Sequence, residues 1–220
     1  MLLLKKLNSL VFAKCRLRLS AYNFQIISSL KMSKTAVVIL SEGAEEMEAI
    51  ISADVLRRAG VKVTIAGLHG SSPVKCSRDV VIVPDASIQD VAKQNFDAVI
   101  LPGGLQGAEN LSKSDIVKEM LQTQEKSGRL VAAICAAPIA LKIHSIGTGK
   151  TITSHPCKQK DLSTGEYNYI EDRVAVDENL ITSRGPGTAF EFALAIVKHF
   201  FGKEKAESLI GPMLVNATIN

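Results

Sequence analysis

One cysteine stands where an apolar run turns directly into a predicted helix. In "RLVAAICAAPIALKIH", Cys135 follows five small or branched apolar residues and precedes an Ala-Ala-Pro run. At a helix N-terminus, backbone N–H groups and the helix dipole favour a thiolate, which is a nucleophile. Free cysteine is also among the most buried residue types. Cys135 is therefore either a reactive thiol or a small packing residue, and its position alone leaves both interpretations open.

Three glutamates begin another predicted helix, in "SEGAEEMEAI". For Glu45 and Glu46 we predict a solvated first turn, where carboxylates suit the helix dipole. Glu48 lies near Met47 and Ile50 in a helix that must pack on a sheet, so we expect it to be partly buried. A desolvated carboxyl keeps its proton near neutral pH and can donate a hydrogen bond to a thiolate.

Two further groups follow predicted strands. In "LPGG", Gly103 and Gly104 form a tight turn, expose a backbone N–H as an oxyanion donor, or do both. His155, in "TSHPCK", is placed to orient a group near Cys135, although a lone histidine is more often structural. "GTGKT" is excluded as a phosphate loop, because it lacks the first glycine and precedes a strand.

Strand-like and helix-like segments alternate along the chain after Met32. Near-continuous Val, Ile and Leu in the strands predict a parallel sheet covered on both faces, which is a doubly wound α/β fold. In such sheets, ligands bind outside the carboxyl ends of the strands, where the groups named above converge. The predicted strands are 34–40, 61–68, 96–104 and 129–134; the predicted helices are 45–60, 87–95, 114–128, 137–145, 187–202 and 203–215; hairpins are expected at 74–85 and 167–182.

Composition describes a globular chain. The 220 residues are 46% hydrophobic and 22% charged, which suits one sizeable domain. The apolar runs are too short to cross a membrane. Residues 1–31 hold six Lys or Arg and no acidic residue, so their removal changes the net charge from +4 to −2. The remainder is mildly acidic, which argues against a nucleic-acid-binding face.

The basic leader is typical of a mitochondrial transit segment, or is an extension ahead of a start at Met32. We therefore predict a separable segment, 1–31, and a single domain, 32–220. The four cysteines are widely spaced and include no C-x-x-C pair, which favours a reducing compartment and no zinc site. We expect a cytoplasmic protein, with mitochondrial targeting by residues 1–31 as the alternative.

Several longer stretches resemble the PfpI superfamily, and within it the animal branch of the parkinsonism-associated protein deglycases. They run in order through nearly all of the chain from Met32 to Val215, and only residues 1–31 fall outside. The matching stretches are "AVVILSEGAEEMEAI", "LRRAGVKVTIAGL", "CSRDVVIVPDAS", "DAVILPGG", "AAICAAP" and "TSRGPGTAFEFALAIV".

The resemblance implies a flavodoxin-like fold, a homodimer and a set of site residues. Its reactive cysteine falls on Cys135, its protonated glutamate on Glu48 and its nearby histidine on His155. Its backbone oxyanion donors fall on Gly104 and Ala136. Some relatives carry a histidine directly after the nucleophile, where this chain has Ala136, so hydrolysis by a Cys-His triad is disfavoured.

The implied activity needs neither metal nor organic cofactor. Cys135 would add to small α-oxoaldehydes or to their adducts on protein side chains, as in glyoxalases and deglycases, with a role in oxidative-stress protection. The alternative is a non-enzymatic redox sensor and chaperone that uses the same cysteine, whose thiolate peroxide would oxidise. A cysteine peptidase ranks below both.

Overall fold

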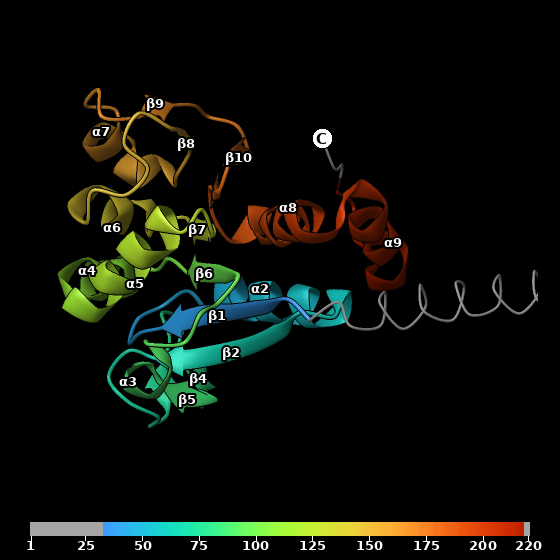
Figure 1. Ribbon diagram of the computed structural model, residues 1–220, viewed down its shortest axis with the longest axis horizontal. Helices are drawn as coiled ribbons and strands as arrows, with labels where there is room; N and C mark the ends of the chain where they lie inside the picture. The colour runs from blue at the N-terminus through green and yellow to red at the C-terminus, as the bar shows by residue number, and fades with distance from the viewer. Residues whose placement is uncertain (1–32, 218–220) are drawn as a thin grey trace, which may run out of the picture. The chain divides into compact units, whose positions relative to one another are not determined.

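The computed structural model describes residues 33–217, and the residues from Lys34 on form one compact unit around a seven-stranded sheet (Figure 1). The sheet order is β10-β11-β7-β6-β1-β2-β5, and only β10 runs antiparallel to its neighbour. Its strands are β1 (Thr35–Leu40), β2 (Lys62–Gly67), β5 (Ala86–Ser87), β6 (Ala98–Leu101), β7 (Leu130–Ile134), β10 (Val174–Asp177) and β11 (Leu180–Ser183). Its five long parallel strands follow the 2-1-3-4-5 order of flavodoxin-like folds.

Helices cover both faces of this sheet. One face packs against α2 (Glu46–Ala59), α8 (Ala189–Phe201) and α9 (Lys203–Met213), and the other against α3 (Ile88–Val91), α4 (Leu105–Lys113), α5 (Asp115–Lys126) and α6 (Pro138–Ile143). Figure 1 shows α4, α5 and α6 grouped in green and yellow, apart from α8 and α9 in red. Successive side chains of β1 enter alternate cores, as strand geometry requires. The predicted fold class is confirmed.

Smaller elements complete the described residues. The hairpin of β3 (Val74–Lys75) and β4 (Val81–Ile82) is antiparallel, as predicted. A parallel pair joins β8 (Thr151–Ile152) and β9 (Asn168–Tyr169), and the remaining turns are η1 (Pro156–Lys158), α7 (Gln159–Leu162) and η2 (Pro186–Thr188). Within residues 33–217, no helix is long and apolar enough to cross a bilayer.

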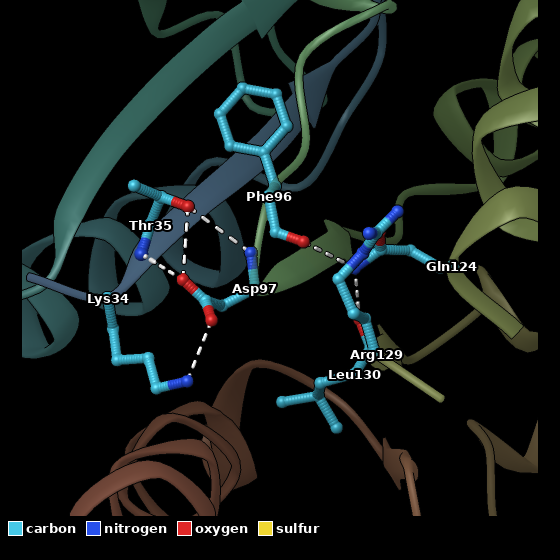
Figure 2. Close-up of polar contacts among 7 residues, drawn as sticks. All are labelled: Lys34, Thr35, Phe96, Asp97, Gln124, Arg129 and Leu130. Atoms are coloured by element: carbon cyan, nitrogen blue, oxygen red, sulfur yellow. Dashed lines mark hydrogen bonds and ion pairs between the residues drawn. The ribbon is translucent and has the colours of Figure 1, made fainter. Parts of the chain in front are cut away.

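Hydrogen bonds to Asp97 tie together the starts of β1 and β6. Its carboxylate accepts from the Lys34 ammonium at 2.7 Å and from the Thr35 backbone N–H at 2.8 Å, with the Thr35 hydroxyl at 3.2 Å (Figure 2). The Asp97 N–H in turn donates to the Thr35 hydroxyl. Asp97 therefore fixes the register of two central strands at the edge where they begin.

Gln124, on helix α5, ties together the starts of β6 and β7 by hydrogen bonds. Its amide nitrogen donates to the carbonyls of Phe96 and Leu130, both at 3.1 Å, and its amide oxygen accepts from Arg129 Nε at 2.8 Å (Figure 2). The side chain is only 2% exposed. A buried amide with its bonds satisfied on two strands holds the helix and the sheet in one arrangement.

Two segments differ from the sequence-based expectation. Helix α4 was not predicted, because "LQGAENLSK" has few apolar residues and carries a glycine inside the helix. Gly107 is required there, since a Cβ would lie 2.8 Å from Ala44 Cα. The expected hairpin at 167–182 is only β10–β11, because β9 pairs with β8 instead. The predicted leader lies outside the described residues.

Candidate active site

Cys135 occupies a strained turn between β7 and α6. Its φ of +65° is left-handed, a conformation that costs a non-glycine residue on the order of 1–3 kcal/mol. Backbone bonds hold the turn on both sides: its N–H donates to Ser183 O at 2.9 Å, and its carbonyl accepts from the His155 N–H at 2.8 Å. The side chain is half-buried. The thiol is thereby lifted out of the strand, as in a nucleophile elbow.

Glu48 brings a fully buried carboxyl to this thiol. Its side chain is 0% exposed, and Oε2 accepts the Gly103 N–H at 2.7 Å. The other oxygen, Oε1, is buried and has no hydrogen-bond partner within residues 33–217. The Cys135 thiol lies against the same carboxyl. Burial raises the pKa of Glu48 to about 7, while the Gly103 N–H and the thiol oppose that rise.

The first turn of α2 differs from the prediction in detail. Glu46 is not solvated: it is 7% exposed and accepts from the Ser77 hydroxyl at 2.9 Å. Met47 and Ile50, expected to pack on the sheet beside Glu48, are 51% and 43% exposed. Glu48 is therefore buried because it lies on the opposite side of the helix from these two residues, not because it accompanies them.

Two glycines close the site from the loop after β6. A Cβ on Gly103 would lie 2.6 Å from Cys135 Cβ and 2.8 Å from Glu48 Oε2, so any side chain here would separate the thiol from the carboxyl. Gly104 has φ +82°, and a Cβ there would collide with Gly43 O. The N–H groups of Gly104 and Ala136 both face the Cys135 sulfur. The family resemblance indicated these two donors, whereas nothing in the sequence indicated that the Gly103 N–H anchors Glu48.

The expected low pKa of Cys135 does not follow from this geometry. Burial, then the charge of Glu48, raises the pKa of the thiol to about 12, while the N–H groups of Gly104 and Ala136 lower it. Helix α6 has only six residues, so its dipole is small. Cys76, which is 4% exposed, also has a raised pKa, about 11, through burial and neighbouring glutamates. The helix N-terminus therefore does not outweigh burial.

The pair must be treated as one titrating unit, because the charge of each group disfavours the charge of the other. The proton that leaves Cys135 has an acceptor in Glu48, whose pKa is near neutrality. Once protonated, Glu48 no longer repels a thiolate and becomes a donor to it. Thiolate formation at Cys135 is thus coupled to protonation of Glu48.

His155 is beside the elbow, but its ring has another partner. The backbone N–H of His155 donates to the Cys135 carbonyl. The ring atom Nδ1 accepts from the Cys157 N–H at 3.2 Å and so caps η1. The ring contributes to the loop that supports Cys135. Among the described residues, no three His, Cys, Asp or Glu side chains are grouped to hold a metal ion.

Fold and site together define a class: a flavodoxin-like protein with a cysteine on a strand-to-helix turn and a buried glutamate against it. Residues 34–199 match the DJ-1/PfpI family. The chain is 54% identical over 184 residues to the Parkinson disease protein 7 homolog of Danio rerio, a match that covers 83% of this chain and 97% of that protein. The chain therefore belongs to the DJ-1/PfpI family.

Two other relatives bear on the site. The crystal structure of Drosophila melanogaster DJ-1beta is similar with a TM-score of 0.82 at 54% identity, covering 84% of this chain and 100% of that one. The glutathione-independent glyoxalase DJR-1.2 of Caenorhabditis elegans is 44% identical over 181 residues, covering 82% of this chain and 96% of that protein. The predicted family is confirmed.

Proposed function

We propose that this protein is a cofactor-independent thiol enzyme that converts small α-oxoaldehydes to hydroxy acids. The observation that carries the proposal is the contact between the Cys135 thiol and the buried Glu48 carboxyl, within reach of two backbone donors. This set can form a covalent adduct and move protons on it. The glyoxalase name of a 44% identical relative supports the same substrate class.

The first step is addition of the thiol to the aldehyde carbon. Glu48, as carboxylate, accepts the Cys135 proton while the sulfur forms a bond to the carbonyl carbon. Negative charge develops on the aldehyde oxygen, which the N–H groups of Gly104 and Ala136 stabilise. Glu48 then returns its proton to that oxygen, which gives a hemithioacetal. A group with pKa near 7 suits both transfers at neutral pH.

The second step is a proton shift within the adduct. Glu48 removes the proton from the former aldehyde carbon while the adjacent carbonyl oxygen gains one, which gives an enediol. The adjacent carbon then gains a proton and the hydroxyl on the sulfur-bearing carbon loses one, which gives a 2-hydroxy thioester. Water cleaves the thioester and releases the hydroxy acid and the free thiol. Methylglyoxal and one water thus give lactic acid, with no net oxidation and no cofactor.

The same attack accounts for a deglycase activity in which the aldehyde is first held as an adduct on a protein side chain. Cys135 would form a bond to the aldehyde carbon as the bond from that carbon to the protein nitrogen or sulfur breaks, and Glu48 would pass the thiol proton to the departing atom. The released hydroxy acid would be the same. We include this activity, and the protection from aldehydes formed under oxidative stress, in the proposal. His155 serves in it as a supporting residue, through its backbone bond to the Cys135 carbonyl.

The decisive experiment measures lactate formed from methylglyoxal by wild type, Cys135→Ser and Cys157→Ser. Cys157 is exposed and lies outside the pair, so its variant is the matched control. We expect many turnovers per thiol in wild type and Cys157→Ser, and none above background in Cys135→Ser. Full activity in Cys135→Ser would overturn the nucleophile. An inactive wild type whose Cys135 is oxidised once by peroxide would instead favour the redox sensor and chaperone.

We also propose that the protein forms a homodimer through the N-terminal part of α2 and the β3–β4 hairpin. These two elements pack together, because Glu46 accepts from Ser77 and Arg78. They expose five large apolar side chains, at 43% to 67%: Met47, Ile50, Val80, Val81 and Val83. Contact with the same surface of a second copy would cover them, as a two-fold symmetric interface does.

Sedimentation of wild type, Val81→Asp and Val176→Asp tests the dimer. Both valines are 58% exposed, but Val176 lies on the edge strand β10. We expect wild type and Val176→Asp to sediment as dimers and Val81→Asp as a monomer. A monomeric wild type would refute the dimer, and a dimeric Val81→Asp would refute the surface.

A further inference from the structure

Glu45, one residue before α2, belongs to a closed ring of hydrogen bonds around the site. Its backbone N–H donates to Gly103 O at 3.0 Å. The Gly103 N–H donates to Glu48 Oε2 at 2.7 Å, and the Glu48 N–H donates to Glu45 Oε2 at 2.8 Å. The ring joins the start of α2 to the loop after β6. Moving any one of the three residues strains the bonds of the other two.

The ring fixes both parts of the proposed machinery that act on Cys135. One part is the Glu48 carboxyl, held through its own backbone and through Gly103. The other is the Gly104 N–H, which faces the sulfur. Gly104 packs so tightly on Glu45 that a Cβ there would lie 2.8 Å from the Glu45 nitrogen. Glu45 therefore sets where the acid and the oxyanion donor sit relative to each other.

Glu45 also brings a negative charge close to Glu48. The groups that face Glu48 are the Cys135 thiol and the Gly103 N–H from neighbouring loops, and Glu45 from the start of its own helix. Glu45 is itself faced by Glu46 and Arg78. Burial is the main reason that Glu48 holds its proton, and the like charge of Glu45 acts in the same direction.

We propose that Glu45 is a positioning residue for the reaction: its side chain holds the Glu48 backbone, its backbone N–H holds the Gly103–Gly104 loop, and together they set both against Cys135. Because the Glu45 carboxylate is a like charge beside Glu48, the same arrangement also favours the protonated form of Glu48. The part that concerns the reaction rests on the proposed function. The effect on the Glu48 proton does not, because it concerns the resting protein. A plain helix cap would stabilise α2 and leave the titration of Glu48 unchanged.

The test compares Glu45→Gln, which keeps an acceptor oxygen and removes the charge, with Glu45→Ala, which removes both. Ser114→Ala is the matched control, because Ser114 caps α5 by the same kind of bond to a backbone N–H. The carboxyl carbon of Glu48 is followed by NMR in ¹³C-Glu-labelled full-length protein, and its signal is identified by its loss in Glu48→Gln. Lactate formation from methylglyoxal is measured on the same samples.

We expect the Glu48 midpoint to fall by about half a pH unit or more in Glu45→Gln and to stay at the wild-type value in Ser114→Ala. Turnover should fall several-fold in Glu45→Gln and further in Glu45→Ala, with a smaller change in KM. An unshifted midpoint in Glu45→Gln would overturn the proposal. If wild type forms no lactate but the midpoint moves, the proposed function fails while the role of Glu45 in holding the proton stands.

Discussion

The two ends of the parallel strands carry polar groups of opposite kinds. At the starts of β1 and β6, the Asp97 carboxylate accepts hydrogen bonds from Lys34 and Thr35. At the starts of β6 and β7, the Gln124 amide donates to the Phe96 and Leu130 carbonyls and accepts from Arg129. At the carboxyl ends, Glu48 leaves Oε1 without a partner among the described residues. Cys135 there adopts a left-handed φ. One end is a satisfied network, and the other holds unsatisfied and strained groups.

The groups at the strand starts stabilise the fold, whereas those at the carboxyl ends are suited to chemistry. A buried amide whose hydrogen bonds are made contributes modestly to the stability of the fold. Its removal is costly, because its former partners stay buried and cannot bond to water instead. A buried carboxyl with an unused oxygen is costly while it is present, and that cost keeps its proton near neutrality. Substitutions at the two ends should therefore change stability in opposite directions, and only those at the carboxyl ends should change catalysis.

The largest effect on stability is expected for Gln124→Ala. The change removes the amide donor from the buried Phe96 and Leu130 carbonyls, at about 1–3 kcal/mol each, so we expect a loss of about 4 kcal/mol. Urea denaturation measures it, with Gln122→Ala, a partly exposed residue of the same helix, as control. Lactate turnover per folded molecule should be unchanged. A loss below 1 kcal/mol would mean that the network does not hold the strand starts.

Glu48→Gln should act in the opposite direction. A folded pKa near 7, raised from 4.5, means that the native state holds a proton that the unfolded state has released between these pH values. Wild-type stability should therefore fall by about 3 kcal/mol as pH rises from 4.5 to above 7. Glutamine has no proton to lose, so the variant should gain stability relative to wild type at pH 8 and not at pH 4.

Denaturation at both pH values measures that gain, and Glu109→Gln on the exposed face of α4 is the control. Lactate turnover should fall at least about 100-fold in Glu48→Gln, because an amide cannot shuttle a proton. If the variant is active and no more stable than wild type at pH 8, Glu48 neither moves a proton in the reaction nor destabilises the fold when it ionises.

Sequence patterns predicted the fold because its parallel strands are short apolar runs between amphipathic helices. They also predicted which residues meet, since Glu48, Gly104 and Cys135 each follow a strand of one parallel sheet and must share its edge. Helix α4 was missed because its glycine is needed for packing against Ala44, a contact that no local pattern contains.

The electrostatics of the site could not be predicted in the same way. The helix dipole at Cys135 is visible in the sequence, but the burial that outweighs it depends on the Gly103 loop closing over the thiol. Glu45 and Glu46 resemble a solvated first turn, and their roles depend on the loop after β6 and on the hairpin. Packing between distant segments decides these properties.

Peroxide should distinguish Cys135 from the other described cysteines. We expect limited peroxide to add oxygen first to Cys135, about tenfold faster than to Cys76 or Cys157, because Glu48 can accept the Cys135 proton and two backbone N–H groups stabilise the resulting thiolate, which is the form that peroxide oxidises. Cys76 is buried among glutamates, and Cys157 is exposed. Mass spectrometry of tryptic peptides locates the added oxygen. Earlier oxidation of Cys76 would show that the elbow confers no selectivity.

The smallest effect is expected for Lys34→Met at the satisfied edge. The Lys34–Asp97 pair is 40% and 32% exposed, so solvent screens it, and Asp97 keeps its bonds to Thr35 when the ammonium is removed. We expect a loss below about 1 kcal/mol at pH 7.

Hydrogen bonds and the charge of Lys34 lower the pKa of Asp97 against the opposing effect of burial. The pair therefore stabilises the fold above the ordinary pKa of an aspartate, and that stabilisation is lost as pH falls through the lowered value. Urea denaturation at pH 7 and pH 2.5 should show a smaller difference between the two proteins at the second pH than at the first. An equal difference at both would assign the effect to the packing of Lys34 over Phe200.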